Sequence, residues 1–215
     1  MTQITTIFGV VVTPTVLLSA LVVCADIVAY VYYNLKLFSG KGSPSKVLWF
    51  IWVIIAGLNA ASYLSVSQDT VKTALAIENA FACVITFCFA YKYGEVKRLT
   101  SNEKKILSIG IAAGAAWWVF RNAFYANALL QIATIVSFWP FIAKVWAKPE
   151  SEPRIPWLIW TVSYAMNLVV VILRWRGSWH DLFYPINYAV QHLAVFVLTL
   201  RRTRSGFVPR DQRRT

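Results

Sequence analysis

The stretch WFIWVIIAGLNAASY, residues 49–63, returns in altered form as WLIWTVSYAMNLVVV, residues 157–171. The two stretches lie 108 residues apart and share two tryptophans and one asparagine in register. At the same offset, Asn79 falls on Asn187. Parallel repeats of a helical unit within a membrane are a transporter design, in which the ligand lies where the halves meet. We therefore expect a duplicated helical protein with its site between the two copies.

The composition around these stretches is that of an integral membrane protein. Hydrophobic residues make up 58% of the 215 residues, charged residues make up 14%, and the mean hydropathy is +0.57. A spanning helix needs about 20 mostly apolar residues. Seven transmembrane helices are predicted, at residues 7–33, 47–66, 71–91, 106–120, 127–146, 156–174 and 180–200. We expect Pro14 to bend or start the first, and we expect no cleavable signal peptide because residues 1–6 lack a basic region.

The net charge of +12 is distributed unevenly over the connections between these helices. Seventeen of the 21 Lys and Arg residues fall on the side of the C-terminus, and Lys72, Arg121, Arg174 and Arg176 fall on the other. The positive-inside rule then predicts a multi-pass protein with its N-terminus outside and its C-terminus in the cytoplasm. This distribution argues against nucleic acid as a partner. The expected partners are the lipid bilayer and a small-molecule solute, and a homo-oligomer is left open.

The repeat predicts an all-α architecture of three helices, a linker helix and three more helices. The first unit covers residues 1–92, and residues 93–125 hold a cytoplasmic loop and the linker helix. The second unit covers residues 126–202, and residues 203–215 form a basic cytoplasmic tail. A single linker helix is required because three spans leave the chain on the opposite side of the membrane. A second unit with the same orientation then needs one extra crossing.

Motifs for metal, cofactor or covalent chemistry are missing from the sequence. Cys24, Cys83 and Cys88 all lie within predicted spans, and neither a Cys-x-x-Cys pair nor a glycine-rich phosphate loop occurs. We interpret the cysteines as small packing residues. No metal site and no cofactor are predicted.

Polar and aromatic side chains at helical spacing supply the candidate solute site. A pair of Asn side chains can both donate to and accept from a polyhydroxyl or amide-bearing solute, and aromatic faces can stack on it. Asn and Gln in membrane helices also bond neighbouring helices. We favour that helix-joining role for Asn59 and Asn167, and the ligand role for Asn79 and Asn187. The candidate binding residues are Trp52, Asn59, Tyr63, Asn79, Trp160, Asn167, Tyr184, Asn187 and Gln191.

Short motifs in the second half point to a known family. The run Glu152-Pro153-Arg154-Ile155-Pro156-Trp157 places an acidic residue before proline and an aromatic, and Asn167, Asp181 and Tyr184-Pro185-Ile186-Asn187 follow. The first half echoes them with Leu58-Asn59, Asp69 and Asn79. These motifs resemble the SWEET and PQ-loop family of solute transporters, whose members have three helices, a linker and three helices. The resemblance extends over nearly the whole chain in architecture.

The resemblance implies specific roles for a few residues. An Asn on the third and seventh helices, here Asn79 and Asn187, would bind substrate together with an aromatic on the second and sixth. Tyr63 matches that aromatic position in the first half, whereas Val171 occupies it in the second. Pro140 resembles one of the family's hinge prolines, and no Pro-Gln dipeptide is present. We expect Asn79 and Asn187 to face each other across a central cavity, with Tyr63 and either Trp157 or Trp160 as walls.

Three ionisable residues fall inside predicted spans. Such residues are functional candidates because burying a charge in the bilayer costs several kcal/mol. Glu78 adjoins Asn79 and is a candidate proton carrier, as is Asp26, although a helix-joining hydrogen bond would also explain either one. We interpret His192 as a core residue. The sequence thus predicts an alternating-access transporter for a sugar-like or amino-acid-like solute, with proton coupling open.

Two other functional classes are alternatives to a transporter. A membrane-embedded enzyme of terpene-cyclase type would use Glu78 or Asp26 as its catalytic acid. It would need a largely apolar aromatic pocket. A receptor on the same fold would bind a ligand without transporting it. A pocket open to lipid would favour the enzyme, and a shallow one-sided basic cavity would favour the receptor.

Overall fold

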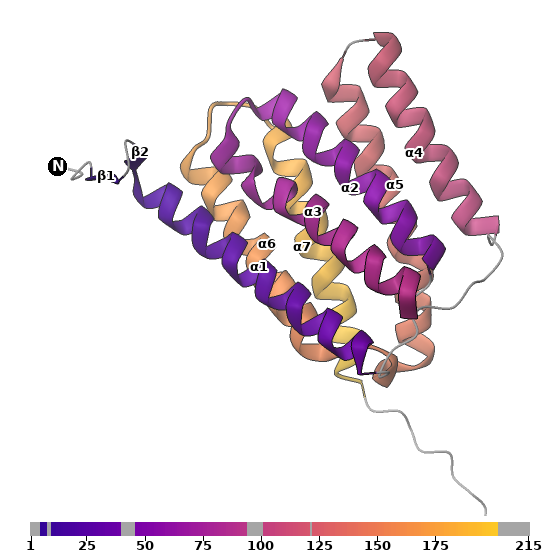
Figure 1. The fold of residues 1–215 in the computed structure, drawn as a ribbon. Helices are drawn as coiled ribbons and strands as arrows, with labels where there is room; N and C mark the ends of the chain where they lie inside the picture. Colours follow the sequence, from indigo (N-terminus) through magenta and orange to yellow (C-terminus); the bar gives the residue numbers. More distant parts are fainter. Residues whose placement is uncertain (1–4, 8–9, 40–45, 94–100, 121, 202–215) are drawn as a thin grey trace, which may run out of the picture.

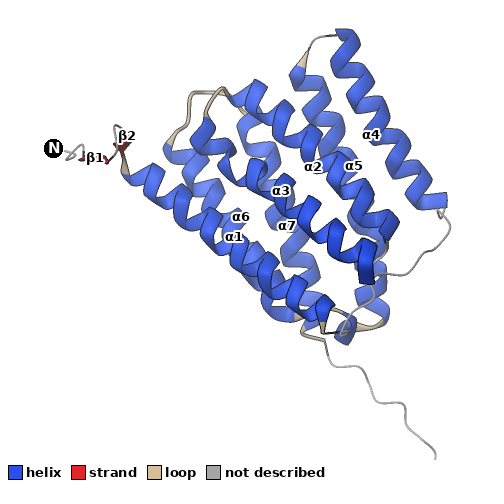
Figure 2. Ribbon diagram, in the orientation of Figure 1, coloured by secondary structure: helices blue, strands red, loops and turns tan. Residues whose placement is uncertain are grey.

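The chain folds into a bundle of long helices that run alternately up and down along the sequence, shown in Figures 1 and 2. The structure is a computed structural model, and it describes residues 5–7, 10–39, 46–93, 101–120 and 122–201. The helices are α1 (Pro14–Phe38), α2 (Lys46–Ser67), α3 (Thr70–Tyr93), α4 (Ser101–Phe120), α5 (Ala123–Ala147), α6 (Arg154–Leu173) and α7 (His180–Thr199). A 3-10 turn, η1 (Pro149–Ser151), precedes α6. Residues 203–215, the predicted tail, lie outside the described residues.

The first helix begins later than its apolar run. The strands β1 (Thr5–Ile7) and β2 (Val10–Val12) pair antiparallel instead of extending α1. Thr13 caps α1 through its hydroxyl, which accepts from the backbone N–H of Val16, and Pro14 occupies the first turn. Proline is favoured there because its fixed φ suits the helix and its missing N–H is not needed. The expected start at residue 7 is therefore wrong, and Pro14 starts the helix.

Six of the described helices are long and apolar enough to cross a membrane: α1, α2, α3, α5, α6 and α7. The helix α4 forms as predicted but is not among them. Its first turn carries Glu103, Lys104 and Lys105, which lower its hydropathy. Large apolar side chains are exposed along the bundle, among them Leu17, Leu21 and Leu35 of α1, each more than half exposed. This pattern is that of a multi-pass membrane protein, whose outer surface meets lipid.

The six long helices form a closed ring in the order α1, α3, α2, α5, α7, α6, each packing on the next. The helix α4 packs outside the ring against α5 and α2, at one edge of the view in Figure 1. We call the end at which α1, α3, α5 and α7 begin the N-terminal end of the bundle, and the opposite end the C-terminal end. The turn between α2 and α3 is tight, with Gln68 at φ +48°.

Candidate functional site

A cavity of about 40 Å³ lies inside the ring, lined by side chains from all six of its helices. Tyr33, Trp49 and Trp157 belong to the parts of α1, α2 and α6 nearest the C-terminal end, so the cavity lies toward that end. Among the described residues that line it, none is Asp, Glu, Lys or Arg. The full lining is Tyr30, Tyr33, Trp49, Trp52, Ile55, Ala56, Asn79, Cys83, Thr134, Ser137, Phe138, Trp157, Trp160, Tyr188 and His192.

The aromatic walls of the cavity form a cage with internal symmetry. The ring centroid of Tyr30 lies 5.0 Å from that of Trp160, and the centroid of Phe138 lies 5.6 Å from that of Trp52. Adding 108 to Tyr30 gives Phe138, and subtracting 108 from Trp160 gives Trp52. The first contact therefore maps onto the second at the offset of the sequence repeat.

Three further pairs of contacts obey the same rule. Tyr33 lies 5.8 Å from Trp49, and Phe141 lies 5.0 Å from Trp157. The contact of Tyr33 with Trp160 at 5.5 Å matches that of Phe141 with Trp52 at 5.8 Å, and the Trp49–Trp52 contact at 4.9 Å matches Trp157–Trp160 at 5.1 Å. Edge and tilted ring contacts of this kind add about 0.5–1.5 kcal/mol each beyond burial. The cage is thus both a structural core and a repeated feature.

The polar groups of the cage include both unpaired donors and hydroxyl groups that can accept. The indole N–H groups of Trp52 and Trp160 are buried without a partner among the described residues. The hydroxyl groups of Thr134 and Ser137 donate to the backbone carbonyls of Leu130 and Thr134, at 2.8 and 2.7 Å, so they are left to accept. A buried unpaired donor costs about 1–3 kcal/mol, so such groups favour a bound acceptor.

Asn79 lines the cavity, as predicted, and its carbonyl oxygen is already used. The hydroxyl of Tyr30 donates to Asn79 Oδ1 at 2.7 Å, and the same hydroxyl lies 3.7 Å from Cys83 Sγ. The Nδ2 group of Asn79 is therefore the part of the amide that can donate to a solute.

Asn187 does not face Asn79, so the expected pair across the cavity is wrong. The residues of α7 that line the cavity are Tyr188 and His192. One residue turns a side chain by about 100° around a helix, so α7 presents position 188 to the centre and position 187 to its neighbour α5. His192 is anchored by a 2.7 Å hydrogen bond between its Nδ1 and the carbonyl of Tyr188, and its interpretation as a core residue fits this packing.

The remaining amides form a buried network that joins α2, α5 and α7. Asn59 Oδ1 accepts from Asn127 Nδ2 at 3.1 Å and from Gln131 Nε2 at 2.8 Å. Asn187 Nδ2 donates to Gln131 Oε1 at 2.9 Å, and Gln191 Nε2 donates to Asn187 Oδ1 at 3.1 Å. The helix-joining role predicted for Asn59 is confirmed, and Asn187 shares it.

The other predicted binding residues lie away from the cavity lining. Tyr63 and Tyr184 are fully buried, and their rings pack at a tilt with centroids 5.1 Å apart in the half of the bundle nearer the N-terminal end. Asn167 is buried on α6 without a hydrogen-bond partner among the described residues. Pro140, the predicted hinge, lies within α5, and its side chain is outside the described residues.

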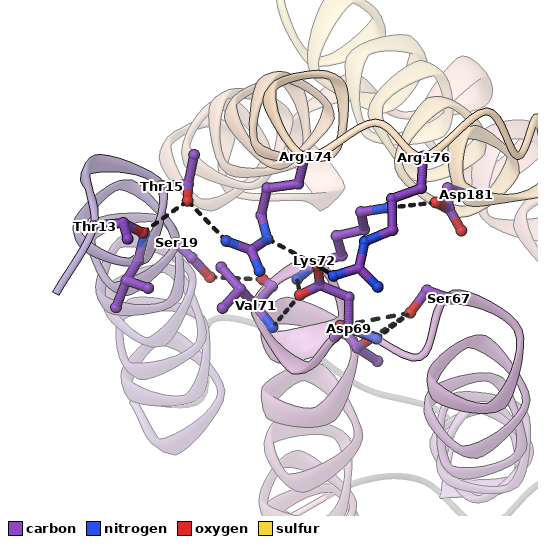
Figure 3. Close-up of polar contacts among 12 residues, drawn as sticks. Thr13, Thr15, Ser19, Ser67, Asp69, Val71, Lys72, Arg174, Arg176 and Asp181 are labelled. Atoms are coloured by element: carbon purple, nitrogen blue, oxygen red, sulfur yellow. Dashed lines mark hydrogen bonds and ion pairs between the residues drawn. The ribbon is translucent and has the colours of Figure 1, made fainter. Parts of the chain in front are cut away.

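Figure 3 shows a polar cluster at the N-terminal end, which joins elements far apart in the sequence. Lys72 Nζ of α3 lies 2.5 Å from Asp181 Oδ2 of α7, and both side chains are almost fully buried. Tyr63 of α2 donates its hydroxyl to the backbone carbonyl of Asp181 at 2.7 Å. Charges buried this deeply persist because each is paired with an opposite charge.

Asp69 is the second acid of this cluster. Its Oδ1 accepts from the backbone N–H of Val71 at 3.0 Å, which caps the start of α3. Its Oδ2 accepts from Arg174 Nε at 2.9 Å, and Arg176 Nη2 lies 3.9 Å away. Burial would raise the pKa of Asp69, but hydrogen bonds from Arg174 and the backbone outweigh it and lower that pKa. Arg174 also donates to the Thr15 hydroxyl at 3.0 Å, which ties α6 to α1.

The C-terminal end is held differently. Lys144 Nζ of α5 lies 2.9 Å from Glu152 Oε1, just before α6. Burial raises the pKa of Glu152, with the charge of Lys144 acting against it. Among the described residues, the ion pairs that join α1–α3 to α5–α7 all lie at the N-terminal end.

The two candidate proton carriers meet. The carboxyl groups of Asp26 on α1 and Glu78 on α3 interact with each other, and neither Asp26 oxygen has a hydrogen-bond partner among the described residues. Asp26 is fully buried, whereas Glu78 is half-buried beside an apolar groove of about 600 Å³ between α1 and α3. Sequence reasoning found each acid but missed the pair, because 52 residues separate them and no local pattern joins the two helices.

Sequence reasoning also missed most of the cage. The cage residues that are not among the predicted site residues are Tyr30, Tyr33, Trp49, Phe138 and Phe141. Each of the two tyrosines falls on a phenylalanine across the repeat, so a search for identical residues does not show these pairs. Matching aromatic with aromatic at the same offset would have shown both pairs.

Comparison of the chain with family models, curated proteins and solved structures found no match.

Proposed function

We propose that this protein is a membrane transporter that carries a small polar solute by alternating access. In this proposal, α1–α3 and α5–α7 are two parallel three-helix units, and α4 is a seventh, linking span. The ring order supports it, because α1, α3 and α2 follow one another as α5, α7 and α6 do. The repeated cage contacts support it as well, because they relate the two units by one sequence offset.

The one-sided ion pairs are the observation that carries the proposal. The pairs Lys72–Asp181 and Arg174–Asp69 join the two units at the N-terminal end. A cavity between the units then lies toward the opposite end. Alternating access needs a barrier on one side of a central site that can be exchanged for a barrier on the other. In this reading the cluster is the closed gate, and its opening requires the units to separate at that end.

The cavity favours an uncharged solute that has acceptor oxygens and a flat apolar face. Its lining holds no Asp, Glu, Lys or Arg among the described residues, so a zwitterionic amino acid is a poorer match than a sugar or a ring-bearing amide. The unpaired indole N–H groups of Trp52 and Trp160 would donate to the solute oxygens, and the rings would stack on its face. At about 40 Å³ the cavity must widen as the units move.

The charge distribution supports an orientation with the N-terminal end outside the cell. Of the four cations predicted on that side, Arg121 lies outside the described residues, and Lys72, Arg174 and Arg176 all pair with acids of the polar cluster. The cations of the other side follow the positive-inside rule. The gate would then face outward, and the cavity would lie nearer the cytoplasm.

Uptake into proteoliposomes tests the proposal. The purified chain would be reconstituted and assayed with labelled glucose, glutamine and nicotinamide, with and without a pH gradient. We expect saturable uptake of at least one of these neutral or zwitterionic probes, lost in Trp160→Leu and kept in Trp118→Leu. Trp118 is a matched control because it is 74% exposed on α4, away from the cavity. Uptake that is equal in both variants and in empty vesicles would refute the proposal.

A membrane-embedded enzyme is the second candidate, because the paired acids border an apolar groove. Glu78 lies beside this groove on the outer face of α1 and α3, where an apolar substrate could reach a proton donor from the lipid. Incubation of the reconstituted protein with a linear isoprenoid, followed by mass spectrometry, separates the candidates. A cyclised product that disappears in Glu78→Gln, without solute uptake, would favour the enzyme.

A further inference from the structure

The Asp26–Glu78 contact has a chemical requirement that neither residue has alone. An ionised carboxylate only accepts hydrogen bonds, so two carboxylates cannot bond each other. The two side chains interact between α1 and α3, so any hydrogen bond between them needs a proton on one of them. Both oxygens of Asp26 and Oε2 of Glu78 are buried without a hydrogen-bond partner among the described residues. The pair thus has one proton to share and no other donor to replace it.

Among the described residues, no cation is paired with Asp26 or Glu78. Within the described part of the chain, the ion pairs at 4.0 Å or less involve Asp69, Asp181 and Glu152 but neither Asp26 nor Glu78. The titratable groups that act on Asp26 from its own and the packed helices are Tyr30 of α1, Cys83 of α3, Tyr164 of α6 and Tyr184 of α7. These phenols and the thiol are uncharged near neutral pH, so they add no positive charge. Two ionised carboxylates this close inside the bundle would repel strongly.

Tyr30 connects the pair to the cavity. Its side chain borders both the cavity and the groove that contains Glu78, and it follows Asp26 by one turn of α1. The same hydroxyl donates to Asn79 Oδ1 at 2.7 Å, and Asn79 follows Glu78 on α3. A hydrogen-bond donor can satisfy only one strong acceptor at a time, so the charge of the pair and the Asn79 amide compete for the Tyr30 proton.

We propose that Asp26 and Glu78 form a single-proton site whose occupancy sets, through Tyr30 and Asn79, which hydrogen bonds the cavity offers to a solute. With the proton present, Tyr30 donates to Asn79 Oδ1, and Asn79 Nδ2 points its N–H groups at the cavity. With the proton lost to water, Tyr30 turns its hydroxyl to the carboxylates, and the Asn79 carbonyl is released. The solute with acceptor oxygens binds the first state better, so proton and solute bind cooperatively. The coupling step rests on the proposed transport function, whereas the proton site does not.

The proton site is tested without any solute. Infrared difference spectra of the protein in lipid nanodiscs would be recorded during a pH titration. We expect the C=O stretch of a protonated carboxyl group near neutral pH, lost in the Asp26→Asn, Glu78→Gln double variant. Glu150→Gln is the control, because Glu150 is exposed at the C-terminal end and should not contribute to that band. The absence of the band in the parent, or its persistence in the folded double variant, would overturn the proton site.

The coupling is tested with Tyr30→Phe and nicotinamide as the probe. One linked proton changes probe affinity by at most about tenfold per pH unit. We expect that dependence in the parent and its loss in Tyr30→Phe, while the infrared band remains and shows that the pair is intact. A Tyr30→Phe variant with the parent's pH dependence would overturn the relay. If no probe of the uptake panel binds or is transported while the band behaves as expected, the transport proposal fails and the proton site stands.

Discussion

Replacement of Lys72 by Met should open the N-terminal end of the bundle. Lys72 is fully buried and Asp181 is 2% exposed, so the variant leaves a buried carboxylate without its partner. Such a loss costs about 3–5 kcal/mol. Because about 1.4 kcal/mol is a factor of ten in an equilibrium, the ratio of closed to open protein should fall by at least about two powers of ten. Water reaching Asp181 in the open state relieves the cost.

The native Cys83 reports that opening. Cys83 lines the cavity and is 3% exposed, whereas Cys24 and Cys88 are exposed on the outer surface and can be replaced by Ala. A membrane-impermeant maleimide added from the side of the N-terminal end should label Cys83 about a hundredfold faster in Lys72→Met than in the parent.

Two further variants sharpen the result. Lys72→Met combined with Asp181→Asn removes both charges, and labelling should return to within about tenfold of the parent, since replacing a whole buried pair is often nearly neutral. Lys144→Met breaks an ion pair at the opposite end within one proposed unit, and labelling from the N-terminal side should not change. Unchanged labelling in folded Lys72→Met would refute the gate.

Three more outcomes follow from the structure. A reporter fused after Thr215 should be cytoplasmic and one placed before Met1 should lie outside; reporters on the same side would exclude seven spans. Trp52→Phe keeps a ring but removes an unpaired buried N–H, so uptake affinity should fall about tenfold while thermal stability holds or rises, and unchanged uptake would remove Trp52 from the site. The pKa of Asp69 is lower in the folded protein than in the unfolded chain. Its contribution to stability is therefore present above its unfolded pKa and is lost as the pH falls through its folded pKa. Asp69→Asn should flatten the acid side of the plot of unfolding temperature against pH, measured by thermal unfolding in detergent, and a plot like the parent's would contradict this.

The sequence predicted the helices well and the site only in part. Long apolar runs set the helix positions, but several ends differ from the prediction: α1 begins at Pro14 instead of residue 7, and α4 begins at Ser101 instead of residue 106. The tryptophans of the repeat lie in the cavity wall because large aromatics at equal positions of two copies meet where the copies face each other. Asn79 lies there too, one turn of α3 from Cys83.

The predictions about the site that were wrong or incomplete share a physical cause. Periodicity gives the stripe on which a side chain lies but not the rotation of the helix in the bundle, and a turn of 100° separates Asn187 from the cavity-lining Tyr188. Contacts between helices distant in the sequence, such as Asp26 with Glu78, depend on ring order and depth together. Lys72 likewise pairs with Asp181, which is 109 residues away in the sequence.

The sequence repeat predicts the same solute-binding role for Asn79 and Asn187, whereas the structure places only Asn79 in the cavity lining. Their Ala variants therefore distinguish the prediction from the repeat and the prediction from the structure. Asn79→Ala removes a cavity amide and should abolish solute uptake while the bundle remains folded. Asn187→Ala removes bonds to Gln131 and Gln191, and interhelical bonds of this kind contribute about 0.6–2 kcal/mol, so the unfolding temperature should fall. Because Asn187 is absent from the cavity lining, its variant should retain the parent's solute affinity at temperatures where it is folded. Equal loss of affinity in both variants, measured by uptake at several solute concentrations, would show that the symmetric pair expected from the sequence binds the solute, and that α7 turns toward the cavity during transport.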